Sequence, residues 1–257
     1  MDVIVRAENV HKTFTLTRKQ KQIEKSVSGK KVALDGLSFT ANKGEIYGLL
    51  GPNGAGKTTM LRILATLIKA DSGDAFVNGY SVRSEPDKVR SSIGFMTSEL
   101  KLEEFFTPNY LFRFFGRMHG LDESVVEERR RDLFSRFGID AFAEVKVRDL
   151  STGMKQKVSL VVSIVQDPPV VIFDEPTNGL DILTAKVVTD FLEELKAQGK
   201  SVILSTHIFS LAEKLCDRIG IIIGGKMVQE GTLQEICGES SLEDAFFEIY
   251  ERTGRSL

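Results

Sequence analysis

With 257 residues and a formal net charge of −2, this chain has room for one large domain or two small ones, and its charge balance does not indicate nucleic acid as a partner. Its two cysteines, Cys216 and Cys237, are in no paired spacing, which excludes a disulfide framework and suits a reducing cytosol. The N-terminus is polar and no apolar run reaches the roughly 18 residues of a membrane span, so we expect a soluble chain without a signal peptide.

Two segments near the N-terminus have the pattern of β-strands. Val3–Val10 alternates apolar and polar residues, and Glu45–Leu50 (EIYGLL) is a short, mainly apolar run. Between them, TRKQKQIEKSVSGKK at Thr17–Lys31 carries six Lys or Arg against one Glu, which we interpret as an extended hairpin loop at the surface. Two interpretations of its charge stay open: a solvated loop, or a contact with anionic lipid head groups.

A glycine-rich sequence follows the second strand and precedes a helical pattern at Met60–Ile68. Its residues are Gly51, Pro52, Asn53, Gly54, Ala55, Gly56, Lys57, Thr58 and Thr59. Strand, loop and helix in this order match the phosphate-binding motif G-x-x-x-x-G-K-[ST], in which backbone N–H groups and the helix dipole face an anion. We expect Lys57 to reach the β- and γ-phosphates of a nucleotide and the Thr58 hydroxyl to ligate Mg²⁺.

A later strand, Pro168–Pro176 (PPVVIFDEP), ends in two carboxylates, Asp174 and Glu175. Because the chain turns where a strand ends, both side chains can line one pocket. Asp174 is predicted to hold Mg²⁺ through its water shell. Glu175 is predicted to polarise the attacking water as a general base.

The order of four sequences along the chain resembles one family. GPNGAGKTT, LSTGMKQ, VVIFDEPTNGLD and STH are similar to the motifs of ATP-binding subunits of ABC transporters, and the resemblance covers nearly the whole chain. The tail SLEDAFFEIYERTG is similar to the exporter branch that includes sodium-extrusion and drug- or antibiotic-export ATPases. The resemblance implies an ATPase that uses ATP and Mg²⁺ and works as a head-to-tail homodimer. It further implies export of Na⁺ or a drug through a separate integral membrane permease, from the cytoplasmic face of the cell membrane.

LSTGMKQ, at Leu150–Gln156, corresponds to the signature motif of that family. The resemblance implies that the Ser151 hydroxyl and the Gly153 amide contact the γ-phosphate held by Lys57 of the other subunit, and we count Gln156 among the nucleotide-binding residues. A serine at a helix start presents a hydroxyl and unsatisfied N–H groups to an anion. The alternative is that the serine is only an N-cap.

Three further positions take roles from the same resemblance. His207, after the strand Val202–Ser205, is expected to hydrogen-bond the γ-phosphate beside Glu175. Asp181 resembles the loop residue that crosses the dimer and couples its two sites. Phe14 stands where an aromatic ring commonly stacks on adenine, a contact of roughly 1–3 kcal/mol per base, although a Phe in a strand is more often part of the core.

The chain also departs from the family pattern. The predicted strand Ser91–Leu100 (SSIGFMTSEL) should end in a glutamine that touches Mg²⁺ and the attacking water, and Ser98 takes that place, followed by Glu99. Ser98 acting through a bridging water and Glu99 approaching the metal directly both stay open. Smaller departures are Thr152, where the family usually has Gly, and Lys157, where it usually has Arg.

The segment between Leu100 and Val165 has the composition of helices, with few Gly and many charges. Within it, FFTPNYLFRFFGRMHG contains six aromatic residues in sixteen, most of which we expect in the core of a helical subdomain. In ABC subunits this surface also forms a groove for a short cytoplasmic helix of the membrane partner. Our candidates for such a groove are Phe105, Phe106 and Tyr110.

We therefore expect a single ABC ATPase domain over residues 1–257, with an α/β P-loop NTPase fold: a mostly parallel sheet, a small antiparallel β part and a helical subdomain. Its expected parts are a RecA-like core with the antiparallel part (about 1–97 and 166–235), the helical subdomain (about 98–165) and a C-terminal helix (about 236–257). Predicted elements of the last third are a helical stripe of Val188, Phe191 and Leu195 ending at Gly199, a hairpin of Ile219–Ile223 with Met227–Gln229, and a helix from Ser241 through Tyr250.

Two rival classes fit less well. A soluble ABC-type ATPase acting on ribosomes or nucleic acid usually has two ATPase domains in one chain or long coiled-coil insertions, whereas this chain has one set of motifs and no heptad run. A P-loop GTPase lacks support, because the NKxD-like string NKGE at Asn42–Glu45 precedes the phosphate loop instead of following it.

Overall fold

A six-stranded sheet forms the centre of the fold in a computed structural model that describes residues 2–17, 29–97 and 102–253. Its strand order is β10-β9-β3-β8-β7-β6, and every neighbouring pair is parallel except β10 with β9. The strands are β3 Ile46–Leu50, β6 Ile93–Thr97, β7 Val170–Asp174, β8 Ser201–Thr206, β9 Arg218–Ile223 and β10 Lys226–Thr232. Every residue of β3, β7 and β8 is buried, as expected for parallel strands covered on both faces.

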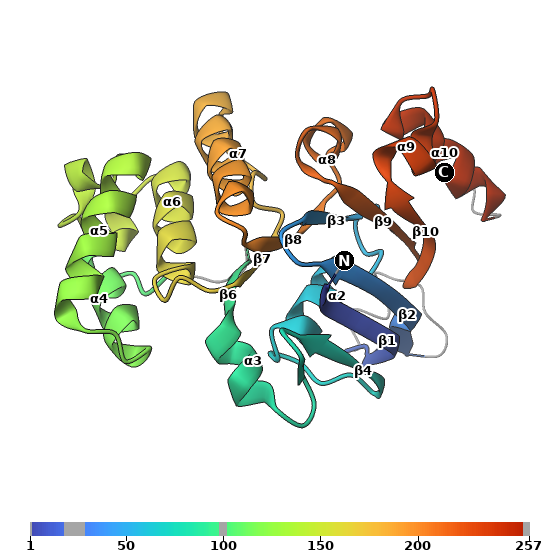
Figure 1. Cartoon of the computed structure of the whole chain (residues 1–257), viewed down its shortest axis with the longest axis horizontal. Coiled ribbons are helices and arrows are strands. Elements are labelled where there is room, and N and C mark those ends of the chain that lie inside the picture. The colour runs from blue at the N-terminus through green and yellow to red at the C-terminus, as the bar shows by residue number, and fades with distance from the viewer. Residues whose placement is uncertain (1, 18–28, 98–101, 254–257) are drawn as a thin grey trace.

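A four-stranded antiparallel sheet lies beside the large one, with the order β2-β1-β4-β5 (Figure 1). Its strands are β1 Val3–Thr15, β2 Lys30–Asn42, β4 Ser72–Val77 and β5 Tyr80–Ser81. The predicted strand Val3–Val10 therefore continues to Thr15, and it forms a hairpin with β2, a strand that was not predicted from the sequence. Residues 18–28, which hold most of its basic loop, lie outside the described part of the chain.

Helices cover both faces of the large sheet. They are α2 Lys57–Leu64, α3 Pro86–Ser92, α4 Pro108–Met118, α5 Glu123–Phe137, α6 Thr152–Ser163, α7 Ile182–Ala197, α8 Phe209–Leu215, α9 Leu233–Cys237 and α10 Leu242–Arg252, with 3₁₀ turns η1 Asp140–Phe142 and η2 Val147–Asp149. One hydrophobic cluster packs α2 between the two sheets, and another packs helices including α5, α6, α7 and α10 on the opposite side. In Figure 1, α4, α5 and α6 gather beyond β6, whereas α9 and α10 lie near β10.

The predicted boundaries of the first helix, Met60–Ile68, are wrong. The helix α2 begins at Lys57, directly after Gly56, whose φ of 113° ends the loop. It ends at Leu64, because Thr66 adopts a left-handed φ of 60° that a helix cannot continue through.

The predicted strand Ser91–Leu100 is also too long at its start. The strand β6 begins at Ile93, because Ser91 and Ser92 complete α3 and donate their hydroxyl hydrogens to the carbonyl oxygen of Lys88. A serine hydroxyl that bonds a carbonyl one turn back is compatible with a helix end.

The elements predicted for the last third of the chain are confirmed. Val188, Phe191 and Leu195 are buried along α7, and β9 and β10 form the predicted hairpin. Ser241 caps α10, since its hydroxyl accepts a hydrogen bond from the amide of Asp244 at 3.1 Å. None of the helices in the described ranges combines the length and apolar character that crossing a membrane would require.

Candidate nucleotide-binding site

The loop between β3 and α2 passes close to other backbone segments. A Cβ on Gly51 would lie 2.3 Å from the carbonyl oxygen of Ile222, and one on Gly56 would lie 2.5 Å from that of Ala33. Gly56 also has a φ of 113°, which side chains rarely adopt. These two glycines are therefore required for the loop to curl against the start of α2.

Lys57 directs its ammonium group into this curl. Its Nζ donates hydrogen bonds to the carbonyl oxygens of Gly51 (2.5 Å) and Pro52 (3.3 Å) and lies 3.6 Å from Oε1 of Glu175. The side chain is only 5% exposed. This burial lowers the pKa of Lys57, while the carboxylates of Glu175 and Asp174 oppose the shift. A lysine held by backbone groups at a helix start is well suited to a phosphate.

Asp174, at the end of β7, is buried beside Thr58. Its Oδ1 accepts hydrogen bonds from the hydroxyls of Thr58 (3.0 Å) and Ser205 (2.5 Å), and its Oδ2 accepts one from Thr97 (3.3 Å). Oxygen ligands, usually one or two carboxylates together with phosphate oxygens, are what Mg²⁺ prefers. The oxygens of Thr58 and Asp174 therefore fit a magnesium ion shared with a bound nucleotide.

Thr97 and Ser205 are not among the residues predicted from the sequence. They stand directly opposite Asp174 on the neighbouring strands β6 and β8. In a parallel sheet, the carboxyl ends of neighbouring strands meet at the edge where ligands bind. A hydroxyl residue near the end of each flanking strand identifies them only once the order and register of the strands are known.

Glu175 leaves β7 in a conformation that non-glycine residues rarely adopt, with a φ of 52°. Its amide donates to the hydroxyl (3.1 Å) and the carbonyl oxygen (3.2 Å) of Ser205. Its Oε2 lies 2.9 Å from Nδ1 of His207, and its Oε1 faces Lys57. This turn brings the second carboxylate to the same pocket as the first, so that the structure brings together the predicted catalytic pair and the glycine-rich loop.

The signature residues lie at the exposed start of α6. The Ser151 hydroxyl accepts a hydrogen bond from the amide of Met154 at 3.3 Å, as an N-cap does. A Cβ on Gly153 would lie 3.8 Å from Oδ2 of Asp181, so the starts of α6 and α7 adjoin. Within the described residues, no hydrogen bond joins the Ser151 side chain to the loop Gly51–Thr59.

Asp181 and Gln156 each bond to their own chain. Asp181 caps α7, where its Oδ1 accepts from the amides of Leu183 and Thr184, both at 3.0 Å. The hydroxyl of Thr184, which donates to Oδ2, and these amide bonds lower the pKa of Asp181. Gln156 donates from Nε2 to the carbonyl oxygen of Pro176 at 3.2 Å, which ties α6 to the segment after β7.

One predicted site residue, Phe14, stands apart from this cluster. Phe14 lies on β1 of the antiparallel sheet, 38% exposed, with Nζ of Lys12 5.5 Å from its ring centroid. It is therefore not the core residue that a strand Phe usually is. Ser98 and its neighbour Glu99 lie outside the described residues.

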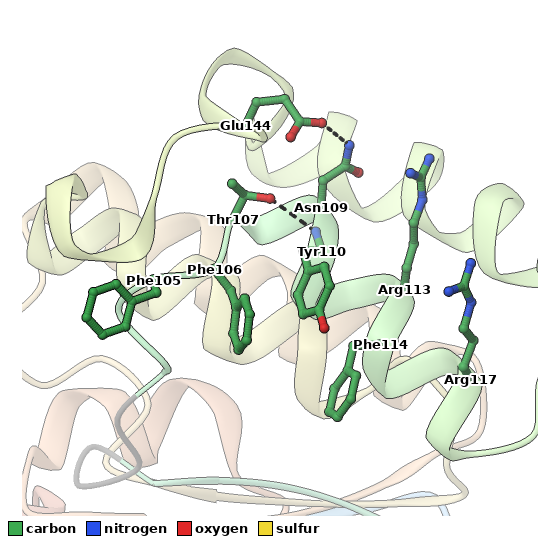
Figure 2. A pocket seen from close by; sticks show the side chains of 9 residues that line it. All are labelled: Phe105, Phe106, Thr107, Asn109, Tyr110, Arg113, Phe114, Arg117 and Glu144. Carbon is green, nitrogen blue, oxygen red and sulfur yellow. Dashed lines mark hydrogen bonds between the residues drawn. The ribbon is translucent and has the colours of Figure 1, made fainter.

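An aromatic groove of about 510 Å³ runs along the start of α4. The three predicted residues, Phe105, Phe106 and Tyr110, line it and are exposed. Phe106 stacks on Tyr110 with ring centroids 4.4 Å apart, and Tyr110 stacks on Phe114 at 6.0 Å. Figure 2 shows these rings on one side of the groove and the side chain of Arg113 pointing away from them.

A buried lysine in a strand–loop–helix unit, facing an aspartate and a glutamate at the end of another parallel strand, defines a P-loop nucleoside triphosphatase. Residues 34–178 match the family described as ABC transporter. The chain is 35% identical over 226 residues to the ABC transporter ATP-binding protein NatA of Bacillus subtilis, covering 88% of this chain and 92% of that protein. It is 37% identical over 229 residues to the doxorubicin resistance ATP-binding protein DrrA of Mycobacterium tuberculosis, covering 89% of this chain and 69% of that protein.

The fold agrees with these relatives. A solved structure of the ATP-binding subunit of an ABC transporter, 28% identical, aligns with a TM-score of 0.85 over 96% of this chain and 99% of that chain. This chain therefore belongs to the ABC transporter family, as one of its ATP-binding proteins, and is an ATPase.

Proposed function

We propose that this ATPase works as a head-to-tail homodimer that powers export through a separate integral membrane permease. The observation that carries the proposal is the division of its site. Lys57 and Glu175 meet in one pocket, while Ser151 caps α6 at the surface, without a hydrogen bond to the phosphate loop within the described chain. A second copy supplies the missing serine turn.

Within one copy, the loop Gly51–Thr59 wraps the triphosphate and Lys57 reaches its β- and γ-phosphates. Phe14 stacks on the adenine ring, which its exposure permits. Thr58 and Asp174 hold Mg²⁺, and Ser98 is a further candidate ligand because it follows Thr97, whose hydroxyl bonds Asp174. When bound, the ion neutralises phosphate charge.

Glu175 acts as the general base toward the attacking water, and His207 orients the water and the γ-phosphate. The 2.9 Å distance between Nδ1 of His207 and Oε2 of Glu175 supports this pairing, since a base and its orienting group must lie within hydrogen-bond reach. Ser205 contributes as a positioning residue, because it bonds both Asp174 and the amide of Glu175.

Across the dimer, the Ser151 hydroxyl and the Gly153 amide donate to the γ-phosphate held by the other copy. A hydroxyl has lone pairs to spare, so Ser151 can keep its bond from Met154 while donating its own hydrogen. Asp181 joins the two sites through the adjoining start of α7. The bond of Gln156 to the carbonyl of Pro176 supports a positioning role for this residue in place of the predicted direct contact.

The aromatic groove receives a short cytoplasmic helix of the permease. Apolar stacked rings that remain exposed suit an amphipathic helix laid into a groove. We assign the parts of the domain as expected from the sequence, with residues 98–165 as the helical subdomain. This subdomain moves with the permease on each dimer closure, and its docking holds the ATPase at the cytoplasmic face of the membrane.

The proposed cargo is Na⁺ or a drug- or antibiotic-like compound. The drug alternative has the support of the relative DrrA, which is named for doxorubicin resistance. The permease determines which of the two is transported.

The experiment that tests this function is trapping the dimer with Glu175→Gln. With ATP and Mg²⁺, this variant is expected to elute from size exclusion with the light-scattering mass of a dimer, because the nucleotide that joins the two copies is not hydrolysed. Adding Lys57→Ala to the same chain is the matched control and should leave a monomer. A Glu175→Gln chain that stays monomeric with ATP and Mg²⁺ contradicts the proposal.

The rival function, action on ribosomes or nucleic acid, is separated by fractionation. Expressed with its permease, the ATPase is expected to sediment with membranes, and sedimentation with ribosomes or DNA would favour the rival.

A further inference from the structure

Two large aliphatic side chains stand exposed at the start of α7. Ile182 is 88% exposed and Leu183 is 80% exposed, although they are neighbours on the first turn of a helix whose other apolar residues are mostly buried. The capping bonds of Asp181 to the amides of Leu183 and Thr184 hold this turn in place. The pair is therefore a fixed apolar projection and not a frayed end.

This projection shares a face with the signature turn. Gly153, at the start of α6, would carry a Cβ 3.8 Å from Oδ2 of Asp181 and 3.7 Å from Oγ1 of Thr184. When Ser151 and Gly153 contact a second copy, Ile182 and Leu183 therefore lie near the same part of that copy.

An apolar cavity of about 220 Å³ adjoins the catalytic pocket of the same chain. Its lining joins Pro52 of the phosphate loop and His207 to the rings of Phe209, Phe247 and Tyr250. Phe209 holds the start of α8 against α10, with its ring centroid 5.2 Å from that of Phe246. Small-molecule pockets usually have roughly 300–1,000 Å³, so this cavity suits a few side chains better than an organic ligand.

We propose that in the ATP-bound dimer Ile182 and Leu183 of one copy insert into this cavity of the other copy. This inference rests on the proposed head-to-tail dimer, in which the signature turn of one copy lies over the phosphate loop of the other. The projection adjoins the signature turn and the cavity adjoins the loop, so the two apolar surfaces meet when the serine turn reaches the phosphate. A two-fold dimer makes the contact twice.

Through this contact, α10 takes part in the closure of the dimer during the ATPase cycle. Phe247 and Tyr250 belong to this last helix, and His207 borders both the cavity and the general base. When Ile182 and Leu183 insert, they pack against the side of the cavity that His207 lines. Dimer closure and the position of the His207 side chain are therefore coupled.

The test uses the full chain with Glu175→Gln, ATP and Mg²⁺. Adding Leu183→Asp is expected to raise the dissociation constant of the dimer, measured by analytical ultracentrifugation, at least about tenfold, because each contact would bury a carboxylate in an apolar cavity. The matched control is Met118→Asp, at an apolar residue of α4 that is 67% exposed and does not line the cavity; it should leave the dissociation constant unchanged.

A crosslink tests the geometry directly. In the same background with Cys237→Ser, the pair Leu183→Cys and Phe247→Cys is expected to form a disulfide between copies only with ATP and Mg²⁺, seen as a dimer band on non-reducing gels. A dimer that is equally tight with Leu183→Asp and forms no crosslink would overturn this inference while the proposed function stands. A parent Glu175→Gln chain that never dimerises would overturn both.

Discussion

The two halves of the proposed ATP site differ in how far one chain completes them. Around Lys57 and Asp174, buried polar groups are already bonded to backbone carbonyls and to hydroxyls of neighbouring strands. At Ser151 and Asp181, the same chain offers exposed helix starts, and the side-chain bonds seen there in the described residues go to amides and a hydroxyl of their own first turns. The first half is preformed, whereas the second has its donors turned to the surface. This difference agrees with the proposed dimer, in which one copy holds ATP and the other supplies the groups that close over it.

Lys57→Ala should have the largest effect, because it removes the buried cation that the glycine-rich loop holds. Hydrogen bonds to charged groups contribute about 1.5–3 kcal/mol each, and this ammonium would make more than one to the triphosphate, so ATP affinity is expected to fall at least about a hundredfold. Equilibrium dialysis with labelled ATP measures the loss. If the affinity for ATP is unchanged, the loop is not the phosphate site, and the buried residues around Lys57 are not a preformed half of the ATP site.

Ser151→Ala should separate binding from turnover. ATP affinity of the isolated copy is expected to stay within about twofold, while turnover falls about a hundredfold, the scale for removing one transition-state donor. The N-cap of α6 is lost as well, at about 1 kcal/mol, so circular dichroism at the assay temperature should verify folding. Ser151→Gly is a useful companion, since glycine costs the cap only a few tenths of a kcal/mol.

Mixing two inactive variants sharpens the same prediction. A heterodimer of Ser151→Ala with Lys57→Ala has one site in which an intact lysine meets an intact serine, provided that the serine comes from the other copy. ATPase activity above that of either variant alone is expected on mixing. Activity that never exceeds the sum of the two would show that each chain uses its own serine.

Tyr110→Ala should have a smaller effect and only where the permease is present. Basal ATPase activity of the isolated chain is expected to stay unchanged, because the ring lines the groove and stacks there on Phe106 and Phe114. Affinity for permease-containing membranes should fall about tenfold, the loss typical of an aromatic anchor in an interface. Met118→Ala, on the same helix but outside the groove, is the control, and equal binding by both variants would reject the groove as the docking surface.

The buried half could be predicted from the sequence more completely than the exposed half. The glycine-rich loop and the strand that ends in Asp174 and Glu175 can be recognised from local sequence. The curl of the loop and the end of the strand are each determined by a few adjacent residues. Thr97 and Ser205 could not be identified in this way, since their contact with Asp174 depends on the register of three strands distant in sequence. No strand was predicted between the basic loop and Glu45, and β2 forms there on a pairing with several irregularities.

The exposed half was predicted only through resemblance. An N-cap serine, a capping aspartate and two apolar residues at a helix start are ordinary local features, and Ile182 and Leu183 would be expected on a buried helix face from hydrophobicity alone. Their exposure depends on how α7 packs on the sheet, which local sequence does not determine.

Ser98→Gln is expected to have the smallest effect on turnover. It tests the candidate metal ligand that follows β6 in the sequence. Thr97 already bonds Asp174 from the end of β6, and Ser98 is the residue that follows it in the sequence. A glutamine there would add one contact, either a hydrogen bond to the water or its amide oxygen as a ligand of the ion, and a hydrogen bond has a net worth of about 0.5–1.5 kcal/mol. Steady-state turnover should therefore be equal or higher, by at most about tenfold, with Ser98→Ala as the matched control. A collapse of turnover in Ser98→Gln would instead mean that the small hydroxyl, or Glu99 beside it, is part of how this ATPase holds its nucleotide.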